Sequence, residues 1–287
     1  MAHEVACVVL SLGNEPGLVA AVRSLLAQDT PAEIVVVNSG GGDPGATLRQ
    51  AGISVDVTTR QERLNPGAVR NLGVASTRAP YIAFLAADCI AEPGWISGRL
   101  RAHRSGGSAV ASAVTNAYPD SCCAWASYML LFSRRAPGSS VPARDRKLFG
   151  VSYARGLFER FGLFREDMRT GEDEEFNRRF SGVAPIAWAP DVRTAHRHPT
   201  RVKALILDQF VRGIRMARGK QRIVGRPQAW RIALYTLRDL PCHVKYIWRG
   251  VERQHRSRVV RACLLMPPAA LAYVSGALLS TRVKLTN

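Results

Sequence analysis

The first candidate functional residue of this 287-residue chain is a single acid, Asp88. It follows the apolar run Tyr81 to Leu85 and lies in a turn of small residues, before Glu92 and Pro93. In open α/β sheets, ligands bind beyond the carboxyl ends of the strands, so Asp88 is placed to hold a metal or a metal-bound phosphate. The alternative is that Asp88 only caps the helix that Pro93 opens.

A second candidate is the run of four acids from Glu172 to Glu175, after Gly171, at the start of a predicted helix. A helix N-terminus favours negative charge. Crowding raises the proton affinity of at least one of these carboxylates, as a general base near neutral pH requires. A charged first turn without a catalytic role is the alternative.

A glycine-rich loop and an arginine on a predicted helix add candidate substrate contacts. The loop SGGGDPG begins at Ser39, directly after a predicted strand that ends at Asn38. Its glycines would let a ligand approach the backbone, and the Asn38 amide can donate to and accept from a base edge. Arg70 lies near the start of the helix that Asn65 and Pro66 open, where it can meet a nucleotide or an acid. A plain turn and a solvated arginine remain the alternatives.

The elements that must position these residues alternate between strands and helices. Apolar runs predict strands at residues 5–10, 33–38, 53–57, 81–85 and 108–114, with helices between them. This alternation predicts an α/β fold with a doubly wound, mostly parallel sheet.

Charge divides the chain in two. From residue 188 on there are 20 Lys and Arg against 4 Asp and Glu, whereas the first 187 residues are nearly neutral. We therefore predict a catalytic domain at residues 1–200 and a basic helical region at residues 201–287. The six cysteines form no CxxC pair and the N-terminus lacks a basic segment, so we expect a reduced, cytoplasmic protein without a signal peptide.

The basic region has the pattern of a membrane-binding segment. Residues 201–220 place arginines beside an apolar helical face, the pattern of an interfacial amphipathic helix, with packing on the catalytic domain as the alternative. A nucleic-acid surface needs no apolar stripe, so we expect an anionic membrane and no nucleic acid, with the protein peripheral on the inner face of the cell membrane. Ala262 to Leu279 carries no charge, and a membrane span, a shallow insertion and a buried hairpin all stay open for it.

Four motifs, in order, resemble those of family 2 inverting glycosyltransferases of the GT-A fold. They are EIVVVNSGGGD, NPGAVRNLG, YIAFLAADCIAEPGW and FERFGLFREDMRTGEDEEFNRRF, and they fall within residues 5–200. The resemblance implies inverting transfer of a hexose from a nucleotide-diphosphate sugar to a hydroxyl of a lipid-linked or polysaccharide acceptor. A non-catalytic module of the same fold that binds a nucleotide sugar or a membrane is the alternative.

The resemblance also implies roles for single residues. Asn38, with Ser39 beside it, and Arg70 would contact the nucleotide, and Asp173 would be the base with Glu172 beside it. Asp88 would hold Mg²⁺ or Mn²⁺ on the diphosphate. This chain departs from the family in having Asn38 for an aspartate and Ala86-Ala87-Asp88 for the DxD pair. One carboxylate suffices for a magnesium held by phosphates, and His196 could replace the missing acid as a metal ligand.

Overall fold

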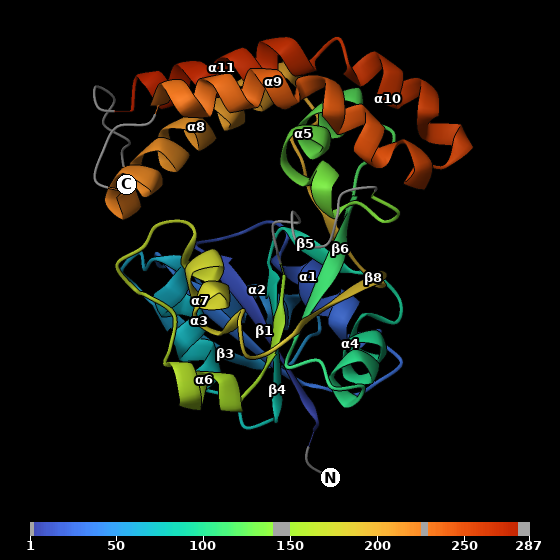
Figure 1. Ribbon diagram of the computed structural model, residues 1–287. Coiled ribbons are helices and arrows are strands. Elements are labelled where there is room, and N and C mark those ends of the chain that lie inside the picture. Colours follow the sequence, from blue (N-terminus) through green and yellow to red (C-terminus); the bar gives the residue numbers. More distant parts are fainter. Residues whose placement is uncertain (1–2, 140–149, 225–228, 281–287) are drawn as a thin grey trace. The chain divides into compact units, whose positions relative to one another are not determined.

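The computed structural model describes residues 3–139, 150–224 and 229–280 (Figure 1). Its contacts divide the chain into two compact units, Met1–Val114 with Lys147–His196, and Thr115–Arg146 with Arg197–Asn287. This grouping puts Thr115–Arg146 and residues 197–200 with the second unit, and the division into a catalytic domain at residues 1–200 and a basic region at 201–287 stays a prediction.

The first unit is built on a sheet that has eight strands among the described residues, in the order β3-β2-β1-β4-β7-β6-β8-β5. Strands β3, β2, β1 and β4 are parallel, while β7 is antiparallel to β4 and β6, and β5 is antiparallel to β8. The predicted α/β fold is confirmed, and its parallel part is the half that carries the first three motifs. The strands are β1 Val5–Leu12, β2 Glu33–Ser39, β3 Asp56–Arg60, β4 Tyr81–Ala86, β5 Cys89–Ala91, β6 Ala109–Asn116, β7 Ser152–Ala154 and β8 Ile186–His196.

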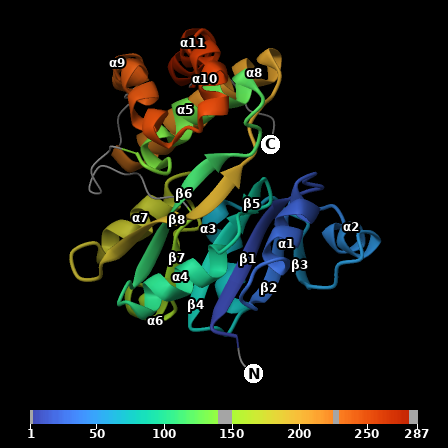
Figure 2. The same cartoon turned by 90° about the vertical axis from the view of Figure 1, so that its right-hand side faces the viewer.

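Both faces of this sheet are covered by helices, so its central strands are apolar on both sides. Successive side chains of a strand point to opposite faces, and on β1 Cys7 and Val9 join one core cluster while Val8 joins the other. Figure 2 shows α1 and α2 against the β1–β3 side of the sheet. The first cluster includes α1 (Leu18–Leu26), α2 (Pro44–Gln50) and α4 (Trp95–Arg104), and the second includes α3 (Pro66–Ala75), α6 (Gly156–Phe161) and α7 (Glu172–Phe180).

One local prediction was wrong, and one alternative is excluded. The third strand begins at Asp56 and not at Ile53, because the Ile53 amide donates to Leu48 O at 2.9 Å and closes the end of α2. Asp88 does not cap a helix, because the short strand β5 intervenes and α4 begins only at Trp95. The turn at Asp88 therefore joins two strands of the sheet.

The second unit is helical in its described part. Its helices are α5 Cys122–Phe132, α8 Val202–Val224, α9 Ala229–Ile247, α10 Arg256–Ala262 and α11 Met266–Leu278, with short 3₁₀ turns at Ser133–Arg135, Trp248–Gly250 and Arg253–His255. Helices α8 and α11 approach closely because two glycines face the other helix: a Cβ on Gly213 would collide with Tyr273 O, and one on Gly276 with Phe210 O. On the predicted apolar face, Leu205 and Ile214 are buried whereas Val202 is 52% exposed, so part of that face is used for packing.

The uncharged run from Ala262 to Leu279 is interrupted between α10 and α11. Within the described ranges, no single helix has both the length and the apolar composition to cross a membrane. Arg253–Ala262 and Met266–Leu278 meet those criteria only as a pair, with a bend of 53° between them.

Candidate active site

The ends of β1 and β2 organise the glycine-rich loop. Ser11 pairs with Asn38 in the parallel register, and Asn38 is fully buried with its Nδ2 donating to Gly41 O at 2.6 Å. Ser39 is also buried, and its carbonyl accepts from the Gly13 amide at 2.8 Å. Asn38 Oδ1 has no hydrogen-bond partner among the described residues. The structure thus gives both residues a loop-organising contact, and their contact with a nucleotide stays a prediction.

The loop itself needs glycine. Gly40, Gly41 and Gly42 have φ angles of 82°, 76° and 80°, a left-handed conformation that side chains disfavour. Asp43 then caps α2 by accepting from the Ala46 amide at 2.7 Å. The sequence run SGGGD therefore encodes a defined backbone path, and the approach of a ligand to it stays a prediction.

Arg70 lies in the protein interior and not in solvent. Its Nη1 donates to Glu172 Oε1, and the side chains are only 14% and 6% exposed. Its guanidinium carbon also lies 5.7 Å from the ring centre of Phe84 and 5.6 Å from that of Phe164. Burial alone would lower the pKa of Arg70, but the carboxylates of Glu172 and Asp173 more than offset this and raise it. The solvated alternative is wrong: Arg70 ties α3 to the start of α7.

Asp173 is the acid that this arrangement leaves facing a pocket. Gly171, with a φ of 83°, forms the turn into α7, and Asp173 Oδ1 accepts from the Glu174 amide at 2.8 Å. Asp173 is partly exposed, whereas Glu172 is buried against Arg70. The pocket is lined by Leu10, Arg70, Phe84, Leu85, Ala86, Cys89, Gly150, Val151, Tyr153, Asp173 and Thr194.

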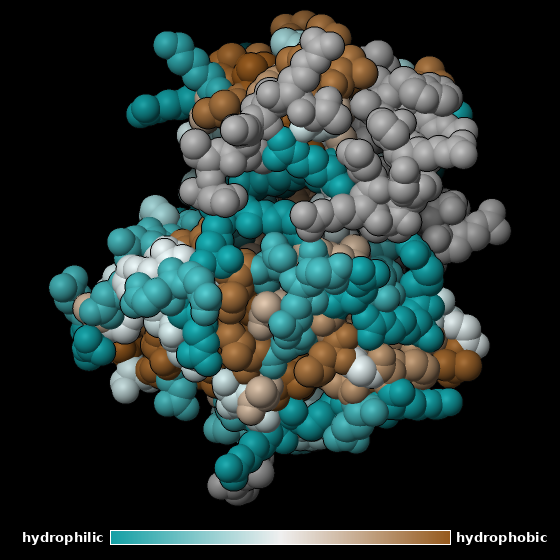
Figure 3. Space-filling model, turned by 90° about the vertical axis from the view of Figure 1, so that its left-hand side faces the viewer, coloured by the Kyte–Doolittle hydropathy of each residue, from teal (hydrophilic) through white to brown (hydrophobic). Residues whose placement is uncertain are grey.

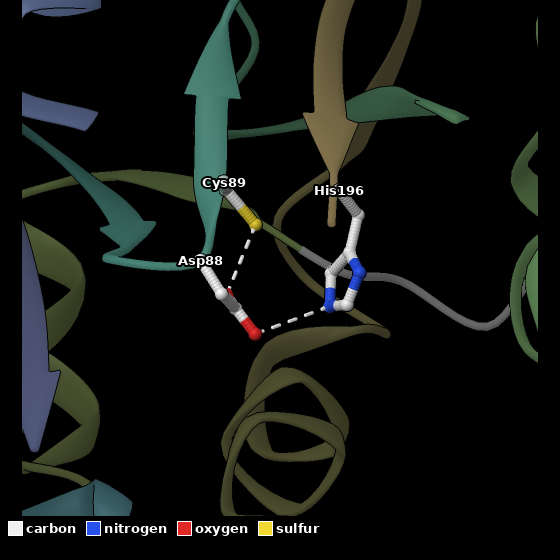
Figure 4. Close-up of side chains that lie close together, drawn as sticks. All are labelled: Asp88, Cys89 and His196. Carbon is white, nitrogen blue, oxygen red and sulfur yellow. Dashed lines mark hydrogen bonds and ion pairs between the residues drawn. The ribbon is translucent and has the colours of Figure 1, made fainter. Parts of the chain in front are cut away.

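A group of possible metal ligands stands beside this pocket, with Asp88, Cys89 and His196 as its members (Figure 4). Their ligand atoms all lie within 4.8 Å of one another, with His196 Nε2 3.5 Å from Asp88 Oδ2 and Cys89 Sγ 3.4 Å from Asp88 Oδ1. Oxygen, nitrogen and sulfur donors at these separations fit one divalent cation. The structure brings the predicted pair Asp88 and His196 together and adds Cys89.

Sequence reasoning missed Cys89 because it did not predict β5. That strand pairs with β8 in a register that sets Cys89 directly opposite His196. Directly opposed residues in a sheet have neighbouring side chains on the same face. The three residues Cys89–Ala91 that form this strand are too few for a sequence pattern to identify it.

A buried arginine supports the pocket from behind and was also missed. Arg99 is fully buried, donates to Gly150 O at 2.7 Å and to Ser112 Oγ at 2.9 Å, and lies over the Trp95 ring at 4.0 Å. Burial lowers the pKa of Arg99 to about 9. Trp95 Nε1 in turn donates to Thr194 Oγ1 at 2.8 Å, so Arg99 and Trp95 fix two residues that line the pocket.

Solved structures with a similar fold include a glycosyltransferase. The structure superposes on the mannosyltransferase PcManGT from Pyrobaculum calidifontis in complex with GDP-Man and Mn²⁺, with a TM-score of 0.62 and 14% identity, over 98% of this chain and 88% of that one. It superposes on S. aureus TarS 1-349 with a TM-score of 0.55 and 12% identity, over 97% and 91% of the two chains. These likenesses define the fold as that of GT-A glycosyltransferases.

A sequence comparison identifies the family to which the chain belongs. A family profile, Glycosyl transferase family 2, matches residues 7–156, and the chain belongs to that family. It is also 33% identical over 93 residues to the succinoglycan biosynthesis protein ExoU of Rhizobium meliloti (strain 1021). That match covers 31% of this chain and 27% of the relative's length. The predicted resemblance to family 2 glycosyltransferases of the GT-A fold is confirmed.

Proposed function

We propose that this glycosyltransferase moves a hexose, with inversion, from a nucleotide-diphosphate sugar to a hydroxyl of a lipid-linked or polysaccharide acceptor. The observation that carries the proposal is the pocket in which Asp173 and Cys89 share one lining, with Asp88 and His196 beside it. The proposed base and the proposed cation site thus lie in the same unit.

The residues divide the work by their positions. Asn38, Ser39 and the glycine loop they organise would bind the nucleotide at the ends of β1 and β2. Asp88 and His196 would hold a divalent cation on the diphosphate. When bound, such a cation neutralises the charge that develops on the leaving diphosphate.

Asp173 would act on the acceptor. Its carboxylate takes the proton of the acceptor hydroxyl as that oxygen forms a bond to the anomeric carbon. The bond from that carbon to the diphosphate breaks on the opposite side, the nucleoside diphosphate leaves with the electron pair, and the configuration inverts. Glu172 is the carboxylate that hydrogen-bonds to Arg70, so Asp173 is the acid proposed to meet the acceptor.

The second unit would attach the enzyme to an anionic membrane surface at the inner face of the cell membrane. Large apolar side chains stand exposed on it beside arginines, including Leu207 at 64% and Leu264 at 79% exposure. Figure 3 shows brown apolar and teal hydrophilic side chains together on the surface of this unit. Apolar insertion combined with basic charge is the pattern of interfacial membrane binding, and lipid-linked acceptors lie at such surfaces.

Donor binding and stereochemistry test the enzymatic part. UDP-, GDP- and dTDP-sugars are screened for thermal stabilisation with and without Mn²⁺, and the product of the stabilising donor is analysed by NMR. We expect one donor class to raise the melting temperature and the product to have the inverted anomeric configuration. A retained configuration would refute Asp173 as the base of a single displacement. Donor binding without transfer to any acceptor would favour the non-catalytic module.

Co-sedimentation tests the membrane part. We expect the protein to pellet with anionic vesicles and to be released by salt, because each basic residue near such a surface contributes about 1 kcal/mol that salt screens. Neutral vesicles are the matched control. If the protein is retained on DNA but does not pellet with anionic vesicles, the membrane proposal is refuted and nucleic acid is the partner of the basic region.

A further inference from the structure

We propose that Cys89 is a third protein ligand of the cation site, and that its thiolate makes the site prefer Zn²⁺ or Co²⁺ over Mg²⁺. The inference rests on the proposed function only in that the same site would face the donor diphosphate. The metal preference itself depends on three side chains, Asp88, Cys89 and His196.

Strand pairing places the sulfur. Cys89 and His196 are directly opposed in the antiparallel β5–β8 register, and both are buried. In Figure 4 their side chains extend from neighbouring strands into the same space, which Asp88 enters from the turn before β5. The backbone of the sheet thus positions Cys89 and His196, and Asp88 is the residue directly before Cys89 in the chain.

The separations fit simultaneous ligation. A tetrahedral ion with metal–ligand distances of about 2.0–2.3 Å keeps neighbouring ligand atoms about 3.4–3.6 Å apart. The structure has Cys89 Sγ 3.4 Å from one oxygen of Asp88 and His196 Nε2 3.5 Å from the other. The ligand atoms of all three residues also lie within 4.8 Å of one another.

The donor set then determines the preferred metal. Mg²⁺ takes oxygen ligands in octahedral geometry, and this site offers one carboxylate because alanine stands at position 86. Sulfur and imidazole nitrogen favour Zn²⁺ and Co²⁺, which also lie above Mn²⁺ in affinity for such sites. On binding, the Cys89 thiol releases its proton to solvent and a metal–sulfur bond forms.

Substrate access is preserved in this arrangement. Cys89 and His196 are buried, whereas the Asp88 side chain is 42% exposed, so a bound ion would be accessible from the Asp88 side. Diphosphate oxygens can reach the ion from that side, as substrate or water does in catalytic zinc sites with three protein ligands.

Cobalt spectroscopy on the full chain tests the ligand. Titration of the parent protein with Co²⁺ should give an intense near-ultraviolet charge-transfer band of a cobalt–thiolate bond. The band should disappear in Cys89→Ser and persist in Cys122→Ser, the matched control at a cysteine of the second unit. Competition should show Mg²⁺ displacing Co²⁺ at least tenfold less effectively than Zn²⁺ does. No band in the parent, or loss of the band in Cys122→Ser instead, would overturn the proposal.

A second measurement needs no variant. X-ray absorption of the parent chain with one Zn²⁺ bound should show a sulfur scatterer at about 2.3 Å beside nitrogen and oxygen at about 2.0–2.1 Å. A shell of nitrogen and oxygen alone overturns the proposal even if Cys89→Ser fails to fold. Neither measurement uses donor or acceptor, so a sulfur-free shell in an active enzyme refutes only this inference, while a sulfur shell in a chain that transfers no sugar refutes only the proposed function.

Discussion

Breaking the ion pair between Arg70 and Glu172 should destabilise the first unit strongly. Arg70→Met leaves the Glu172 carboxylate, 6% exposed, without its cation. Removing one partner of a buried ion pair costs about 3–5 kcal/mol, because the remaining charge keeps its desolvation penalty. The neighbouring rings of Phe84 and Phe164 lose their contact with the guanidinium as well, which places Arg70→Met at the upper end of this range.

Chemical denaturation of the parent, Arg70→Met, Glu172→Leu and the double variant measures the effect. We expect each single variant to lose about 3–5 kcal/mol and the double variant to lose clearly less than the sum, since it leaves no unpaired charge. Glu172→Gln should lose least, because its amide oxygen still accepts from Arg70. If both single variants lose less than about 1 kcal/mol, the pair behaves as a solvated surface pair and the burial argument is refuted.

The same set of variants separates two roles of Arg70. If Arg70 only holds the start of α7, donor affinity should follow stability and recover in the double variant. If Arg70 contacts the nucleotide, donor affinity should stay low in the double variant although stability recovers. Isothermal titration with the donor found in the thermal screen distinguishes the two outcomes.

Four further predictions concern the remaining sites. Asp173→Asn should keep donor affinity while transfer falls about 100-fold or more in a steady-state assay, and full transfer would refute Asp173 as the base. Asp88→Ala should abolish Mn²⁺-dependent donor binding in calorimetry, so unchanged binding would show that the site lies elsewhere. Gly213→Ala should destabilise the chain by about 1–3 kcal/mol on denaturation, because the added Cβ meets Tyr273 O, and a stabilised variant would mean that α8 and α11 are not packed as described. Burial lowers the pKa of His103 to about 4, against about 6.5 when unfolded, so the unfolded chain binds more protons between these pH values and stability falls as the pH drops through them. His103→Gln should flatten that slope in pH-dependent melting, and an identical slope would contradict the assignment.

The sequence determined the parallel half of the fold and the chain positions of the acids. Strands β2 (Glu33–Ser39) and β4 (Tyr81–Ala86) are buried on both faces of the sheet. Their apolar residues are therefore continuous in the sequence, and such runs are easily recognised. The turn residues are equally local, since three successive glycines after Ser39 take a conformation that other residues disfavour. For this reason the four motifs identified the fold and the family before any contact was known.

Tertiary structure decided which side chains meet. Arg70 and Glu172 are 102 residues apart, and only the packing of α3 beside α7 brings them into an ion pair. Cys89 carries no signal of its own, because its place beside His196 comes from the register of two strands that are distant in the sequence. The close approach of α8 and α11 likewise depends on Gly213 and Gly276, which lie 63 residues apart. In each case the local sequence sets the conformation of one segment. Which side chains meet depends on the free energy of contacts between segments that are far apart in the chain, and that free energy cannot be read from either segment alone.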